Sequence, residues 1–212
     1  MKKHIKIFLA ILLICLVGVV NILIIKNNRK LSIEEVKLLL DKGKDINNVY
    51  FEHTVIETNS KEYTMKKYWK DNIFVFEIED TYQWINFDTN EWIYIDNTND
   101  NITSNDTKNC NKFNDYSYYF KDLIEKEYEY KYIKTDDIGN IKCHVVEIKK
   151  ENVGKVKFWI NCENGVVEKF EEYNSIGELT STNIYKYTYN IVTDENIMRP
   201  DFSKYESYTI VK

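Results

Sequence analysis

The sequence predicts a mainly β (α+β) fold: a large curved antiparallel sheet, or half-open barrel, with helices on its concave face and a membrane helix ahead of it. Three observations lead to this prediction. From residue 49 onward, apolar and polar residues alternate with a period of two, which is typical of half-buried strands. Aromatic residues make up 15% of the chain, and a flat sheet would leave too many of them exposed. Only two longer segments after residue 30 have helical spacing.

The chain begins with a candidate membrane segment. Residues 7–25 form a run of 19 residues in which Asn21 is the only strongly polar side chain. As a helix this run would span roughly 28 Å, close to the hydrocarbon core of a bilayer. Lysines precede the run, as in an export signal, but it ends without the small residues that a signal peptidase needs. We interpret residues 1–30 as an uncleaved anchor. The alternative is a lipid anchor at Cys15, which the bulky residues before that cysteine disfavour.

The rest of the chain, residues 31–212, is predicted to be one domain on the extracytoplasmic side of the cell membrane, because long domains cross largely regardless of charge. The chain has 29 basic and 34 acidic residues, and residues 1–30 hold six of the basic ones and no acid. The domain therefore carries 23 positive and 34 negative charges, a net of −11. Nucleic-acid binding needs a clustered positive surface, so we expect no nucleic-acid partner.

The first element of the domain is an amphipathic helix within residues 31–48. Ser32 is a typical N-cap, two glutamates follow in the first turn, and Gly43 is a typical stop. The apolar residues of this segment fall on one helical stripe, so we expect the stripe to pack against the sheet. They are Ile33, Val36, Leu39 and Leu40.

Strands follow in two groups, separated by turn residues. The first group is Val49–Ile56, Glu62–Trp69, Ile73–Ile78, Tyr82–Phe87 and Trp92–Ile95. The stretch Asp96–Asn111 is polar and without period, which predicts a loop, and Phe113–Lys126 has helical spacing. The second group is Tyr128–Lys134, Ile141–Lys150, Lys155–Cys162, Val166–Tyr173 and Thr182–Val192, and a helical turn is expected at Asp194–Met198.

Two cysteines suggest a disulfide across one hairpin. If Lys150 faces Lys155, then Cys143 faces Cys162 at a non-hydrogen-bonded position, where Cα atoms lie about 4.5 Å apart. That spacing is at the near edge of the range for disulfides. The alternative is a pair of buried free thiols, and a slip of one residue would put the side chains on opposite faces. Cys110 would be left over.

The sequence shows no catalytic or metal-binding constellation. The three histidines, His4, His53 and His144, lie in no spaced ligand set, and no glycine pattern marks a nucleophile elbow. We therefore predict that the protein is not an enzyme and holds no metal. Five aromatic residues could line an apolar cavity on the concave face, although ordinary core is the favoured interpretation of them. They are Trp69, Phe74, Phe76, Trp84 and Trp92.

Several stretches together resemble the superfamily of the lipoprotein carrier LolA and the sigma-factor regulator RseB. They are Tyr68–Phe74, Trp84–Asp88, Trp92–Asp96, Cys143–Glu147, Phe158–Lys169, and Val192–Glu195 with Pro200–Tyr205. The resemblance covers most of residues 31–212, and it implies an open, strongly curved sheet with helices over its concave side. Within the superfamily, the size and the ending are most similar to the GerS-related germination lipoproteins of spore-forming Gram-positive bacteria.

The resemblance to that group implies a non-catalytic protein, without a cofactor, that supports a cell-wall (cortex) amidase in spore formation or germination. The first functional hypothesis is therefore a membrane-tethered protein that holds an extracytoplasmic protein partner. The alternative is a carrier or sensor of lipid or another apolar ligand in the concave cavity. A stoichiometric acyl ligand on the purified protein would favour the alternative.

Overall fold

The structure is a computed structural model that describes residues 30–58, 62–107, 128–150, 153–205 and 208–211. The expected helix Phe113–Lys126 lies outside these ranges, as do Cys15, Cys110 and the apolar run 7–25. None of the helices within the described ranges has the length and apolar character of a bilayer-spanning segment.

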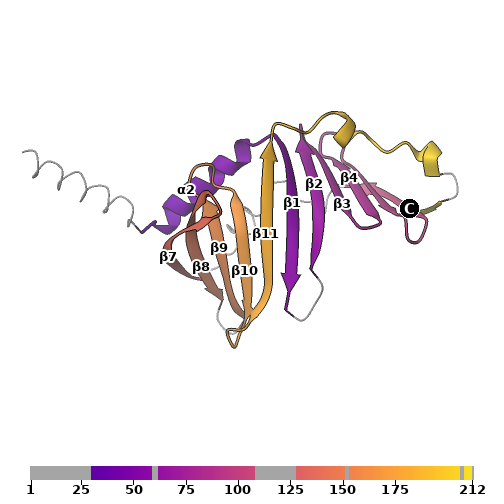
Figure 1. The fold of residues 1–212 in the computed structure, drawn as a ribbon. Coiled ribbons are helices and arrows are strands. Elements are labelled where there is room, and N and C mark those ends of the chain that lie inside the picture. The colour runs from indigo at the N-terminus through magenta and orange to yellow at the C-terminus, as the bar shows by residue number, and fades with distance from the viewer. Residues whose placement is uncertain (1–29, 59–61, 108–127, 151–152, 206–207, 212) are drawn as a thin grey trace, which may run out of the picture.

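One open sheet of twelve strands dominates the structure, and its curvature is visible in Figure 1. The strand order is β12-β6-β5-β4-β3-β2-β1-β11-β10-β9-β8-β7, so β12 and β7 form the two edges. All neighbouring strands are antiparallel except β12, which runs parallel to β6. The predicted half-open barrel is confirmed, and the central pair β1–β11 joins its two halves. The strands are β1 (Asn48–Glu57), β2 (Tyr63–Lys70), β3 (Ile73–Ile78), β4 (Thr81–Asn86), β5 (Glu91–Asp96), β6 (Asn101–Asp106), β7 (Glu129–Ile138), β8 (Ile141–Lys150), β9 (Gly154–Asn161), β10 (Val167–Asn174), β11 (Leu179–Tyr189) and β12 (Thr209–Val211).

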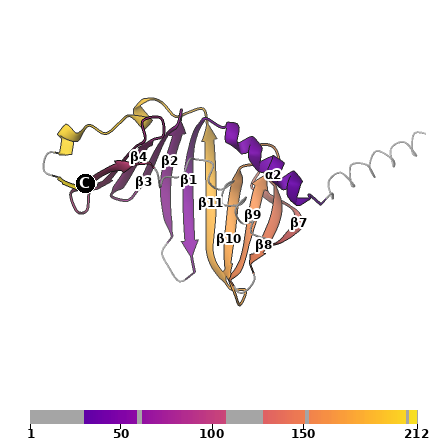
Figure 2. The same ribbon diagram turned by 180° about the vertical axis from the view of Figure 1, so that it is seen from behind.

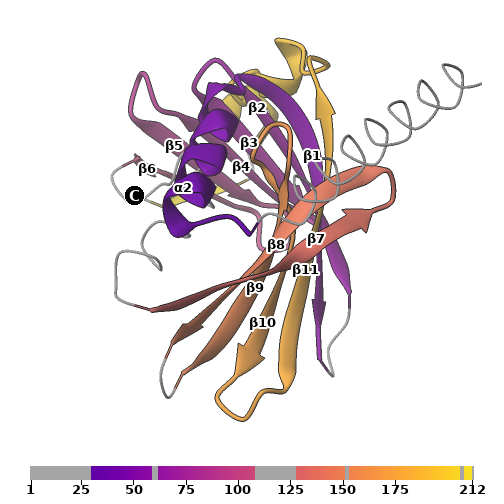
Figure 3. The same cartoon turned by 90° about the vertical axis from the view of Figure 1, so that its left-hand side faces the viewer.

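Helix α2 (Ile33–Lys42) lies across the concave side, over the half of the sheet formed by β7–β11 (Figure 3). A capping box begins the helix: the Glu35 amide donates to Ser32 Oγ, and the Ser32 amide donates to Glu35 Oε2. Val36, Leu39 and Leu40 are buried, as the apolar stripe predicts. After the helix a short 3₁₀ helix, η1 (Gly43–Asp45), leads into β1.

The turn between β9 and β10 fits closely under α2. Asn164-Gly165 forms this turn, as the sequence predicts, and Gly165 has a φ of +75°. A Cβ at this position would lie 1.8 Å from the Leu39 carbonyl oxygen. Glycine is therefore required at position 165 for two reasons: the positive φ of the backbone and the close approach of the helix.

After β11 the chain crosses to the outer face of the sheet, where it runs past the ends of β1–β4 (Figure 2). This C-terminal segment, residues 190–205, contains the 3₁₀ helices η2 (Glu195–Ile197) and η3 (Phe202–Tyr205). The predicted helical turn at Asp194–Met198 corresponds to η2. Beyond the segment, β12 adds to the edge of β6.

One expectation about the strands is wrong, and one further strand had no prediction. The polar stretch predicted as a loop contains β6, which pairs along its whole length with β5. Ile102, at 1% exposure, is its one buried apolar side chain, so backbone pairing and not apolar alternation defines this strand. The sequence also carries no signal for β12, because three residues are too short to show a period.

The register of the β8–β9 hairpin also differs from the expected one. Lys150 pairs with Gly154 instead of Lys155, so Cys143 lies opposite Asn161. This is the slip of one residue that removes the geometric argument for a disulfide. Cys143 and Cys162 are both free thiols in the structure. Gly154 begins β9, and a Cβ there would lie 2.0 Å from the Tyr173 carbonyl oxygen of the next strand, β10.

Candidate binding surface

The sheet buries a separate apolar core on each of its faces. On the concave face, α2 covers a core that runs from β7 to β2 and includes Phe51, Trp69 and Phe158. On the outer face, the C-terminal segment covers a second core over β3–β6, built around Val75, Trp84 and Ile93. Because strand residues alternate between faces, each core takes every second residue of the strands that it covers, and the two cores lie mainly over different strands.

The five aromatic residues predicted as cavity lining do not form one group. Trp69 pairs with Phe74, and the same cross-strand row continues through Ile85 to Trp92, so these side chains share the concave face. Phe76 lies two residues further along the same face.

Trp84 points the other way, because it pairs with Val75 and Ile93 and belongs to the outer core. Its Nε1 donates to the Ile197 carbonyl oxygen at 2.8 Å. The turn occupies residues 87–90, one residue more than the turn at 88–90 that the sequence predicts. A hairpin closed there sets Trp84 opposite Ile93, which places Trp84 and Trp92 on opposite faces. Trp69 packs into the concave core at 7% exposure, against Phe74 and Phe87.

A row of polar side chains crosses the concave face beyond the part under α2. Lys67 Nζ lies 3.0 Å from His53 Nδ1, and His53 Nε2 lies 2.9 Å from Asn183 Oδ1. The row continues from Asn183 through Ser181 to Glu172, with hydrogen bonds of 3.3 and 2.8 Å. It therefore joins four adjacent strands, β2, β1, β11 and β10. Sequence reasoning missed it, because its members lie far apart in the chain.

The two basic groups of this row are held away from their usual pKa values. Burial, with the charge of Lys67 next in size, lowers the pKa of His53 to about 3. Burial also lowers the pKa of Lys67, to about 8. The Lys67 ammonium lies 5.6 and 5.3 Å from the ring centroids of Phe51 and Phe76, which stabilise a cation by cation–π contact. Lys67 has no carboxylate partner among the residues that the structure describes.

The thiols are poor nucleophiles. Cys143 is fully buried, and burial, with the charge of Glu168 next in size, raises the pKa of its thiol to about 12. Burial also raises the pKa of Cys162. Within the described ranges, no three histidine, cysteine or acidic side chains are grouped so that they could hold a metal ion.

Comparison with known proteins supports the fold and goes no further. No protein-family model matches the chain, and no curated protein matches it. Solved structures do match. An uncharacterised conserved protein from Thermus thermophilus is 9% identical, with a TM-score of 0.58 over 85% of this chain and 99% of that one.

MucB is also 9% identical, with a TM-score of 0.50 over 79% of this chain, which spans 62% of the MucB chain. A LolA superfamily protein from Nitrosomonas europaea is 11% identical, with a TM-score of 0.33 over 77% of this chain and 97% of that one. The class that the fold defines is the half-open barrel formed by one curved, mostly antiparallel sheet. The particular likeness within that class is to the Thermus thermophilus protein and to MucB.

Proposed function

We propose that the chain is a membrane-tethered, non-catalytic protein that holds a protein partner outside the cytoplasm. One observation carries the proposal: the aromatic residues that would have to line an apolar cavity are divided between two faces, and Trp69 and Trp84 are buried in two separate cores. Trp69 and Trp84 are therefore closed to a ligand, and only Phe74, Phe76 and Trp92 keep part of their surface on the concave face. Because so few of these rings remain open, we assign binding to the surfaces of the sheet.

The pKa values of the titratable groups support a non-catalytic role. A thiol with a pKa of about 12 is protonated at neutral pH, and a histidine with a pKa of about 3 is a weak base. Neither Cys143 nor His53 is tuned for nucleophilic or acid–base work. The partner in this proposal is a cell-wall (cortex) amidase, because the sequence resembles GerS-related proteins. The expected anchor in residues 1–30 would keep the complex at the membrane.

The proposal is tested by direct binding. The full-length chain in detergent micelles is immobilised, and a purified cortex amidase is passed over it at increasing concentration. We expect saturable binding, and no release of peptidoglycan fragments by the chain alone. A chain unfolded by heat and immobilised at the same density is the control. An amidase that binds the folded and unfolded chains equally, or neither, contradicts the proposal.

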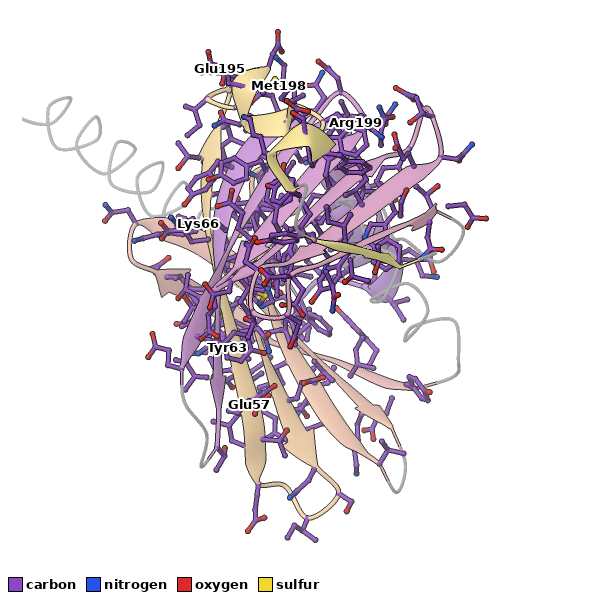
Figure 4. All side chains as sticks on the ribbon, turned by 90° about the vertical axis from the view of Figure 1, so that its right-hand side faces the viewer. Glu57, Tyr63, Lys66, Glu195, Met198 and Arg199 are labelled. Carbon is purple, nitrogen blue, oxygen red and sulfur yellow. The ribbon has the colours of Figure 1, made fainter. Side chains whose placement is uncertain are left out.

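A second function, the binding of an acidic lipid, is favoured by one specific observation. The Lys67 ammonium sits partly buried among aromatic rings on the concave face, where an acidic head group would supply the charge partner. Native mass spectrometry of the gently extracted protein tests this. A bound lipid should be lost in Lys67→Met and kept in Lys66→Met. Lys66 is the neighbouring exposed lysine, which lies on the other face of β2 (Figure 4).

A further inference from the structure

A pocket of about 480 Å³ lies on the outer face, between the C-terminal segment and the neighbouring ends of β3, β4 and β5. Figure 4 shows Met198 and Arg199 on this segment, at the opposite end of the sheet from Glu57. The floor of the pocket is apolar, and charged side chains form its rim. The floor is Ile73, Trp84 and Ile197, and the rim includes Asp71, Glu91, Asp194, Met198 and Arg199.

The charges at the rim do not balance. Arg199 binds Glu91 through two nitrogens, with Nη2–Oε1 at 2.6 Å and Nε–Oε2 at 3.1 Å. Lys70, beside the pocket, pairs with Asp194 at 2.5 Å. Asp71 has no hydrogen-bond or ion-pair partner for its carboxylate among the residues that the structure describes, although it adds to the field that raises the pKa of Lys70. Three carboxylates face two cations, which leaves one negative charge in excess.

An apolar wall lies within reach of that excess charge. Met198 is 62% exposed, and an unbranched thioether side chain adapts to the shape of what it contacts. Ile73 is partly exposed on the same pocket. A long aliphatic stem that ends in a positive charge satisfies both features at once, because it buries methylene groups while its head stays in a polar environment. The domain as a whole, with its net charge of −11, also favours a basic partner.

We infer that this pocket receives a lysine side chain from an extended segment of the partner protein. The methylene stem lies against Ile73 and Met198, and the ammonium pairs with Asp71. The inference rests on the proposed function, since it names the surface that the partner would contact. A single exposed ion pair is worth up to about 1 kcal/mol, so the pocket positions and selects a segment, and further contacts must supply the rest of the affinity.

The experiment uses the Trp84 indole, whose N–H group is hydrogen-bonded to Ile197 at the pocket floor. The full-length chain, labelled with ¹⁵N and held in detergent micelles, is titrated with N-acetyl-lysine methylamide. The Trp84 resonance is assigned from its loss in Trp84→Phe. We expect a saturable shift of this resonance with the lysine probe, and none with N-acetyl-glutamate methylamide. In Asp71→Asn the dissociation constant should rise about two- to fivefold.

Glu57→Gln is the matched control, because it removes one exposed carboxylate at the far end of the sheet. It should leave the dissociation constant unchanged. The inference is overturned if the lysine probe gives no shift, if the glutamate probe gives the same shift, or if Asp71→Asn binds as the parent does. A chain that binds the amidase equally well with and without Asp71 overturns the pocket as the docking site and leaves the proposed function standing. A chain that binds the lysine probe but no amidase overturns the proposed function alone.

Discussion

The concave core and the outer core lie on opposite faces of one sheet and are closed in different ways. A regular helix closes the concave core, with the buried side chains of Val36, Leu39 and Leu40 spaced at one helical turn. The outer core is closed by a segment without regular structure apart from two 3₁₀ turns, and individual polar contacts fix it. Asn48 alone makes two of these contacts, through its side-chain amide and carbonyl, to the backbone of Val192.

The difference shows that an apolar helix stripe and a set of specific hydrogen bonds can each hold a cover over an apolar core. The two differ in their sensitivity to mutation. Burial of a leucine contributes about 1.5–3 kcal/mol and tolerates some change of shape. A hydrogen bond contributes about 1 kcal/mol, and it fails when one partner moves. We therefore expect damage to the concave core to unfold the whole domain, and damage to the C-terminal segment to release that segment locally.

The largest expected loss of stability comes from a substitution at the contact between α2 and the β9–β10 turn, on the concave face. Gly165→Ala should lower the free energy of unfolding by about 3 kcal/mol or more, since a hard contact with Leu39 adds to backbone strain. Chemical denaturation of the full-length chain measures this. Gly177→Ala is the control: its φ is +86°, but nothing lies within 4 Å of the added methyl, so about 1 kcal/mol is expected. Equal losses would show that the helix can move aside.

A second change tests the helix stripe directly. Leu40→Ala removes a side chain at 2% exposure and should cost about 2–5 kcal/mol, again measured by denaturation. Leu38→Ala, on the exposed face of the same helix at 67% exposure, should change stability by less than about 0.5 kcal/mol. If the two variants are equally stable, α2 does not close the concave core.

Acid should lower the free energy of unfolding, because His53 on the concave face takes up a proton when the domain unfolds. Its pKa is about 3 in the folded chain and near 6.5 when unfolded, so the unfolded state binds more protons between these values. Stability is then fully present above pH 6.5 and is lost as the pH falls, by about 2 kcal/mol at pH 5. Denaturation at pH 7 and pH 5 measures the change. His53→Gln should lose less over the same interval, and an identical loss would assign the acid sensitivity to other groups.

On the outer face, a substitution that removes the bonds to the C-terminal segment should loosen that segment and leave the rest of the domain folded. Asn48→Ala removes both bonds to Val192, and the amide of Val192 should exchange with solvent about tenfold faster, which corresponds to roughly 1.4 kcal/mol. Amides in α2 should keep their protection. Hydrogen exchange read by NMR distinguishes the two regions. A parallel loss of protection in α2 would mean that the two cores unfold as one unit.

The smallest effect concerns reactivity. In the native chain Cys143 should resist a thiol reagent, because it is fully buried and its pKa is about 12, while the partly exposed Cys162 should react faster. Peptide mapping after brief labelling separates the two sites. Both should react after unfolding without a reductant. A Cys143–Cys162 peptide pair that resists labelling until reduced would restore the bridge that the sequence suggested.

Much of this architecture was predictable because it depends on short-range signals. Ser32 and Glu35 mark the start of α2, the apolar stripe gives its buried face, and Asn164-Gly165 marks a hairpin. Period-two alternation located ten of the strands. The polar row from Lys67 to Glu172 was not predictable, because its central link joins His53 and Asn183, which lie 130 residues apart in the chain.

What the sequence determined by itself is ten of the strands and the amphipathic helix α2, since a period of two or of 3.6 residues is a local property. Only the tertiary structure decided the register of β8 on β9, the pairing of β6 and β12, and the face on which Trp84 lies. The physical reason is that alternation fixes which residues share a face but not what covers it. Contacts between residues far apart in the chain settle that choice, as when the Ile197 carbonyl oxygen accepts the Trp84 indole N–H.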